Sequence, residues 1–163
     1  MRILGIDPGF SFTGYSVLKK EGPSTQLLDF GYLKLPQSKS LQERVCLFHD
    51  ALDQKIKLFG ITHLAIETPF LGKNAQNFLK LGYLRGILYF LAHKNNLILL
   101  EFAPTQIKQA LTGYGGASKE QVAHILFKLF PTLAKPDKYD ATDALAISLC
   151  GLWKEKSLLQ RLK

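Results

Sequence analysis

The sequence predicts an α/β domain with a mixed five-stranded sheet and helices on both faces. Three observations support this. Three short apolar strands come first, and the turns that join them are too short for parallel crossovers. Helical and strand periodicities then alternate, and the chain finishes on helices. With 163 residues, 47% of them hydrophobic, residues 1–163 are expected to form a single domain.

The first three expected strands form an antiparallel meander. Arg2–Asp7 is a short apolar run typical of a buried strand, and Pro8-Gly9 is a turn signal. Thr13–Leu18 alternates larger and smaller residues. After a Gly-Pro turn, Gln26–Leu35 completes the meander.

Helices and strands alternate through the middle of the chain. Ser40 begins a helix whose apolar residues recur at every third or fourth position, and Gly60 ends it. A strand at 62–67, a helix at about 74–93 and a strand at 97–102 follow. The 62–67 strand ends on a carboxylate, as the first strand does.

The last third is expected to be helical. A short helix runs from 104 to 111. Ser118 is expected to cap the N-terminus of the next helix, with Gln121 in the capping-box position. Pro131 ends that helix. A last helix is predicted from near residue 140 to about 153, and a basic, amphipathic tail follows it.

The composition narrows the class of protein. The chain carries 21 Lys+Arg against 13 Asp+Glu, a net charge of +8, which favours a polyanionic partner such as nucleic acid, although it could also serve solubility alone. Cys46 and Cys150 lie in apolar helical patterns, so buried free thiols are expected. No secretory signal or membrane-length apolar segment is found. A cytoplasmic protein with no membrane contact is therefore expected.

Four acidic residues at the ends of elements are the candidate catalytic groups. Asp7 ends the first strand and Glu67 ends the fourth. If these strands are adjacent and parallel, both carboxylates emerge at the carboxyl edge of the sheet, where ligands bind in open α/β sheets. Asp140 and Asp143 are three residues apart at the start of the last helix, so they share a face. Each acid alone could instead be a turn, surface or helix-cap residue.

A divalent metal is the natural counter-charge for such a group of acids. Carboxylate oxygens suit Mg²⁺ or Mn²⁺, and two ions about 3.5–4 Å apart can activate water and stabilise the leaving oxygen of a phosphodiester. The four histidines lack ligand spacing and there is no Cys-x-x-Cys pair, so zinc is not expected.

Six motifs follow one another over nearly the whole chain: Gly5-Ile6-Asp7-Pro8-Gly9, Thr13-Gly14-Tyr15, Ala65-Ile66-Glu67, Phe70-x-x-Lys73-Asn74-Ala75, Leu81-Gly82-x-x-Arg85-Gly86 and Asp140-Ala141-Thr142-Asp143-Ala144-Leu145-Ala146. The first motif alone is common to many ribonuclease-H-like proteins. The ordered set resembles the RuvC family of bacterial Holliday-junction resolvases (crossover junction endodeoxyribonucleases).

The resemblance implies a ribonuclease-H-like fold and a homodimer that makes paired nicks in a four-way DNA junction during recombination and repair. It implies that Asp7, Glu67, Asp140 and Asp143 are catalytic and hold two Mg²⁺ ions, with Mn²⁺ able to substitute. A branch-migration complex of the RuvA-RuvB type is the further partner that it implies.

Six residues are expected to bind DNA: Phe70, Lys73, Lys80, Arg85, Lys108 and Lys119. The resemblance places Phe70 beside the junction centre, where its ring would stack on an unpaired base. It also places Lys108 and Lys119 at DNA-contacting positions. Lys73, Lys80 and Arg85 add basic charge on and just before the helix expected at about 74–93. For Lys80 the alternative is a place on a solvated helix face. Tyr83, Tyr89 and Phe90 are candidates for the dimer interface or for the core.

Two other functions remain open. A related nuclease could process RNA, or the protein could bind junctions without cutting them. An actin-like ATPase is not expected, because it would need further glycine-rich phosphate loops and about twice the length.

Overall fold

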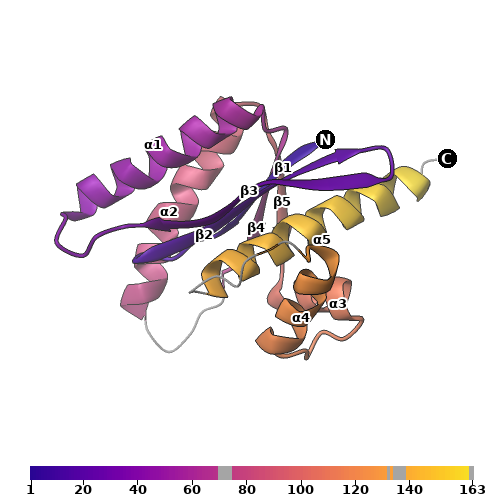
Figure 1. Cartoon of the computed structure of the whole chain (residues 1–163). Coiled ribbons are helices and arrows are strands. Elements are labelled where there is room, and N and C mark those ends of the chain that lie inside the picture. The colour runs from indigo at the N-terminus through magenta and orange to yellow at the C-terminus, as the bar shows by residue number, and fades with distance from the viewer. Residues whose placement is uncertain (70–74, 132, 134–138, 162–163) are drawn as a thin grey trace.

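The computed structural model describes residues 1–69, 75–131, 133 and 139–161, and within the last helix it describes the side chains of 141–154 (Figure 1). The strands are β1 (Arg2–Asp7), β2 (Phe12–Glu21), β3 (Ser24–Lys34), β4 (His63–Glu67) and β5 (Ile98–Phe102). The helices are α1 (Leu41–Phe59), α2 (Ala75–Lys94), α3 (Pro104–Thr112), α4 (Lys119–Leu129) and α5 (Tyr139–Arg161). The predicted α/β architecture is confirmed.

The sheet has the strand order β3-β2-β1-β4-β5, so β1 lies at its centre. β1 pairs with β2 and β2 with β3 in antiparallel fashion, which confirms the meander. β4 is parallel to both β1 and β5. In the β1–β4 register Ile6 lies opposite Ile66, so the residues that follow them, Asp7 and Glu67, leave the sheet side by side. The mixed five-stranded sheet is therefore as predicted.

Helix ends follow the local signals in the sequence. Ser40 caps α1 in a complete capping box with Glu43, and Gly60 closes the helix in the left-handed conformation with φ 56°. Ser118 and Gln121 form the same box at the start of α4. Because these caps satisfy backbone groups that the helix itself cannot, they fix where each helix begins or ends.

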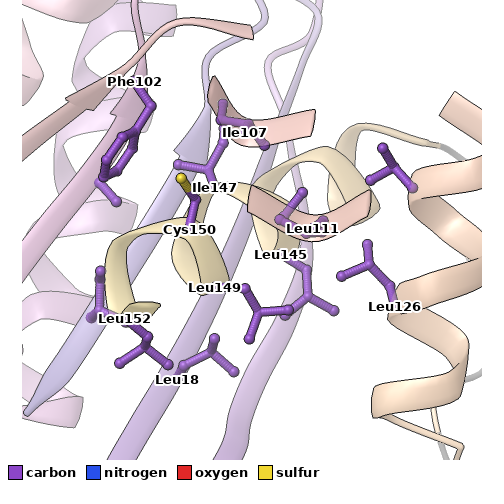
Figure 2. Close-up of a cluster of buried hydrophobic side chains, with 14 of the residues drawn as sticks. Leu18, Phe102, Ile107, Leu111, Leu126, Leu145, Ile147, Leu149, Cys150 and Leu152 are labelled. Carbon is purple, nitrogen blue, oxygen red and sulfur yellow. The ribbon is translucent and has the colours of Figure 1, made fainter. Parts of the chain in front are cut away.

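Helices cover both faces of the sheet (Figure 1). α1 and α2 pack on one face over a core that includes Leu4, Ile66 and Phe48. α3, α4 and α5 cover the other face. Figure 2 shows this second core, in which Leu145 and Leu149 of α5 lie among residues of α3, α4 and the sheet.

Helix α5 lies unusually close to the central strand. A Cβ atom at Gly5 of β1 would lie 2.5 Å from the carbonyl oxygen of Ala144 and 2.8 Å from the backbone nitrogen of Ser148. That same carbonyl accepts hydrogen bonds of 2.9 Å from the hydroxyls of Ser16 and Ser148. Glycine thus permits the approach of α5, and the hydrogen bond from Ser16 of β2 joins the helix to the sheet.

Two expectations are corrected. Cys46 is exposed, because the buried face of α1 runs through Phe48, Leu52 and Ile56, whereas Cys150 is buried as predicted. α5 continues to Arg161 instead of ending near Trp153, since the added residues include good helix formers and neither Gly nor Pro. None of the helices in the described ranges is long and apolar enough to cross a membrane.

Candidate active site

Three of the predicted acids line one cavity of about 230 Å³ at the carboxyl edge of the sheet. Asp7 and Glu67 are the last residues of the neighbouring strands β1 and β4. Asp143 reaches the same cavity from the start of α5, which the close contact at Gly5 holds against β1. The strands and α5 thus bring together acids from three distant segments.

The fourth acid, Asp140, lies in the first turn of α5, and its side chain lies outside the described residues. Because it precedes Asp143 by three residues, its backbone is on the same side of the helix. Phe70 and Lys73 also lie outside the described residues.

Two lysines complete the polar lining of the cavity. Lys108 comes from α3 and Lys119 from the first turn of α4. Lys119 Nζ donates a hydrogen bond of 2.7 Å to Asp143 Oδ2, while 62% of the lysine side chain stays exposed. The remaining wall is mainly apolar: Pro104, Ile107, Val122 and Ala146. An anionic group that enters this cavity would meet ammonium groups beside the carboxylates.

The surroundings of Glu67 disfavour its ionised form. Burial raises the pKa of Glu67, and the negative charge of Asp143 raises it further, whereas Lys119 and Lys108 lower it. Burial and a like charge both disfavour the ionised carboxylate. A bound cation would remove this repulsion.

The donor set fits a hard cation, although the described side chains do not complete a site. Asp7, Glu67 and Asp143 offer only oxygen ligands, which suit Mg²⁺ or Mn²⁺. Among the side chains whose placement is described, Asp140 not included, no group of three His, Cys, Asp or Glu could hold a metal ion. Asp140 is the candidate for the further ligand.

Lys80 and Arg85 of α2 have different surroundings. Lys80 is exposed, with Nζ 6.0 Å from the centre of the Phe10 ring. Arg85 is only 5% exposed, and its guanidinium donates to the backbone carbonyl of Glu67 and to the carboxylate of Glu101. Arg85 thus lies inside the protein, because it is on the buried face of α2 beside Leu84 and Leu88.

The sequence did not point to Glu101, and it offered Tyr89 only as a candidate for the dimer interface or the core. Tyr89 is on α2, and Glu101 lies in β5 opposite Ile66 of β4. A lone acid in the apolar run Ile98–Phe102 was a usable signal, because a charged residue in a strand needs a partner. The sequence gives no way to identify that partner.

A family model described as "Crossover junction endodeoxyribonuclease RuvC" matches residues 3–151. This chain belongs to the RuvC family. A RuvC of Pelodictyon phaeoclathratiforme is 41% identical over 152 residues, which are 93% of this chain and 80% of the relative. The resemblance seen in the motifs is therefore confirmed.

Solved RuvC structures share the fold. The structure of Thermus thermophilus RuvC has a TM-score of 0.87 and 28% identity, and the match covers 96% of each chain. A second T. thermophilus RuvC structure, in complex with Holliday junction substrate, has a TM-score of 0.85 and 29% identity over 92% of each chain. The ribonuclease-H-like fold expected from the RuvC motifs is confirmed.

Proposed function

We propose that this chain resolves Holliday junctions in recombination and repair by hydrolysing phosphodiester bonds at the cavity of Asp7, Glu67 and Asp143. The observation that carries the proposal is the convergence of these acids with Lys108 and Lys119 in one cavity of a RuvC-family chain. The T. thermophilus relative, with which it shares its fold, has been solved with a Holliday junction substrate.

RuvC proteins are metal-dependent nucleases. In more detail, we propose that Asp7 contributes to two Mg²⁺ sites, that Glu67 completes one, and that Asp140 and Asp143 complete the other. Mn²⁺ can substitute for Mg²⁺ in this proposal. Bound Mg²⁺ supplies an activated water and charge stabilisation at the leaving oxygen. The products are a 5′-phosphate and a 3′-hydroxyl, which a ligase can join.

The protein side chains position the DNA. Lys108 and Lys119 bind the phosphate next to the bond that is cut, and the apolar wall limits the water that reaches it. Lys119 would exchange its contact with Asp143 for one with the phosphate. Phe70, Lys73 and Lys80 are proposed to contact DNA nearby, whereas the buried side chain of Arg85 is assigned a different role below.

The proposal includes a cytoplasmic homodimer. Paired nicks require two active sites, one for each cut strand, and α2 exposes apolar side chains that a second copy could cover: Phe78, Leu79, Tyr83, Tyr89 and Phe90. A branch-migration complex of the RuvA-RuvB type is proposed as a further partner that presents the junction.

Incubating the purified protein with a synthetic mobile four-way junction, with and without Mg²⁺, tests the function. We expect symmetric nicks in two opposing strands only with Mg²⁺. Linear duplex DNA and structured RNA of matched length are the control substrates. Preferred cutting of the RNA would support an RNA-processing nuclease instead, and junction binding without nicks at any Mg²⁺ concentration would support a non-catalytic junction-binding protein.

A further inference from the structure

We propose that Arg85, Tyr89 and Glu101 form a positioning network that fixes the backbone at Glu67 and so holds its carboxylate in the orientation that binds metal. The inference rests on the proposed function, because it assigns Glu67 to a metal site. These three residues are called the Arg85 network below.

The peptide group that joins Glu67 to Thr68 is held at both of its polar atoms. Arg85 Nη1 donates a hydrogen bond of 2.5 Å to the Glu67 carbonyl oxygen. The Thr68 N–H of the same peptide group donates one of 2.8 Å to the carbonyl of Phe102 in β5. Because the orientation of this peptide plane determines ψ of Glu67, the two bonds together fix the direction in which its side chain leaves the strand.

The guanidinium of Arg85 is itself held by two further groups. Arg85 Nη2 donates to Glu101 Oε1 at 2.5 Å and to the Tyr89 hydroxyl at 2.8 Å. The Tyr89 hydroxyl donates to the same carboxylate oxygen at 2.9 Å. A planar guanidinium can satisfy such a set of acceptors at once, whereas an ammonium acts as a single point charge. The Arg85 side chain is 7% exposed, so its guanidinium is shielded from water, whereas 36% of the Glu101 side chain is exposed.

The network acts on Glu67 through the backbone. The charged groups that shift the pKa of the Glu67 carboxyl are Asp143, Lys119 and Lys108, which line the cavity. Arg85 instead contacts the carbonyl, and Glu101 lies in the strand register opposite Ile66, the residue before Glu67. Disturbing the network should therefore misplace the Glu67 carboxylate and leave the charges of the cavity unchanged.

Three conservative variants probe the network: Arg85→Lys, Glu101→Gln and Tyr89→Phe. Lys94→Gln is the matched control, because Lys94 forms an ion pair with Asp53 near the other end of the same helix. Four quantities are measured for each protein: Mn²⁺ affinity by electron paramagnetic resonance without DNA, the Mg²⁺ concentration for half-maximal nicking, junction affinity in chelator, and Tm.

We expect Arg85→Lys and Glu101→Gln to weaken Mn²⁺ binding by about 10- to 100-fold, the range seen when residues that orient a metal ligand are removed. The Mg²⁺ concentration for half-maximal nicking should rise by a similar factor. Tyr89→Phe, which removes only one hydroxyl, should act in the same direction with a smaller effect. Junction affinity in chelator should match wild type in all three, and Lys94→Gln should leave metal binding unchanged.

Unchanged Mn²⁺ binding in Glu101→Gln and Tyr89→Phe, together with a lowered Tm, would show a purely structural role and overturn the inference. Loss of metal-free junction binding without a change in Mn²⁺ affinity would show that Arg85 contacts DNA. If Arg85→Lys does not fold, the other two variants still decide the matter. Failure of wild type to bind Mn²⁺ would also overturn the inference, whereas normal Mn²⁺ binding without junction nicking would refute the proposed function alone.

Discussion

Asp7 is the residue on which the proposed chemistry depends most, because it ends the central strand and lines the same cavity as the acids of β4 and α5. Asp7→Asn should lower nicking by a factor of about 1000 or more, the scale on which removal of a catalytic group acts. Junction binding should persist, since the change removes a negative charge and leaves the basic residues in place.

Single-turnover nicking and a junction-binding titration in chelator measure the two effects of Asp7→Asn. Asp50→Asn is the control, because Asp50 is a 77% exposed acid on α1. Nicking by Asp7→Asn at the wild-type rate would remove Asp7 from the site.

Lys119 is predicted to contact a phosphate of the bound DNA. Lys119→Ala should weaken junction binding and reduce the slope of log K against log salt concentration by about 1, as expected for one lost phosphate contact. The control is Lys57→Ala, which removes a similarly exposed lysine that is also paired with an aspartate. A salt dependence identical to wild type would mean that Lys119 serves only as the partner of Asp143.

The burial of Arg85 and the exposure of Cys46 could not be predicted residue by residue. A helical arginine can extend to solvent or turn inward. Arg85 turns inward to bind Glu101, which is on another element. Cys46 adjoins apolar residues in sequence, but it lies off the helix face that carries Phe48 and Leu52. Both outcomes depend on tertiary contacts that sequence periodicity does not contain.

At the scale of elements, the contact between α5 and β1 sets the place of Asp143. Gly5→Ala should lower the free energy of unfolding by about 1–3 kcal/mol, because the new methyl group would overlap the backbone of α5 at Ala144 and Ser148. As α5 moves outward, the distance between Asp143 and Asp7 should grow and nicking should fall. Urea denaturation and nicking rates measure the two effects.

Gly86→Ala is the matched control for the change at Gly5. A Cβ atom at Gly86, in helix α2, would meet nothing within 4 Å, and alanine favours a helix over glycine by about 1 kcal/mol. This variant should therefore be as stable as wild type or more stable. Equal stability of wild type and Gly5→Ala would show that α5 can shift without lowering the free energy of unfolding.

The packing of α1 against α2 includes a cluster of Asp53, Lys57 and Lys94, whose ion pairs measure 2.5 and 3.3 Å. Hydrogen bonding to Lys57 and then to Lys94 outweighs burial and lowers the pKa of Asp53 to about 2, from 3.8. Because the pKa is lowered in the folded protein, this stabilisation is present above about pH 3.8. It is lost as the pH falls towards 2.

Asp53→Asn should lower the free energy of unfolding at pH 7 by about 1 kcal/mol, because Lys57 and Lys94 are 65% and 41% exposed and solvent screens the pairs. The difference from wild type should shrink between about pH 4 and 2. Urea denaturation across this range measures it, with Asp50→Asn as the control. A difference that stays constant over the range would refute the ion-pair origin of the effect.

At the scale of the whole molecule, the proposed dimer depends on the exposed apolar residues of α2. Leu79 is 57% exposed, and Tyr83 and Phe90 follow it on the same side of the helix. Leu79→Glu should convert the dimer to a folded monomer, since a buried unpaired charge opposes association, and paired nicking should be lost. Sedimentation velocity and circular dichroism measure association and folding.

Leu58→Glu is the control for the dimer, because Leu58 is a 71% exposed leucine on a different helix, α1. This variant should sediment as a dimer, as the wild type is expected to do. A monomeric wild type at micromolar concentration, or a Leu79→Glu variant that remains dimeric, would exclude this face of α2 as the interface.

Much of the architecture could be predicted because its signals are local. Short turns required antiparallel β1, β2 and β3, and serine caps marked α1 and α4. The meeting of Asp7 and Glu67 followed from their place at the ends of parallel strands. The cavity wall and the Arg85 network could not be predicted, because they depend on how α2, α3 and α4 pack against the sheet.

The origin of the three cavity acids in the first strand, the fourth strand and the last helix has a consequence during protein synthesis. A nascent chain carries Asp7 from the beginning, yet it lacks Asp143 until α5 has left the ribosome and packed on β1. Proteolytic fragments and truncated products that lack α5 are likewise incomplete. If the cavity acids act as proposed, a chain gains nuclease activity only after α5 has packed on β1.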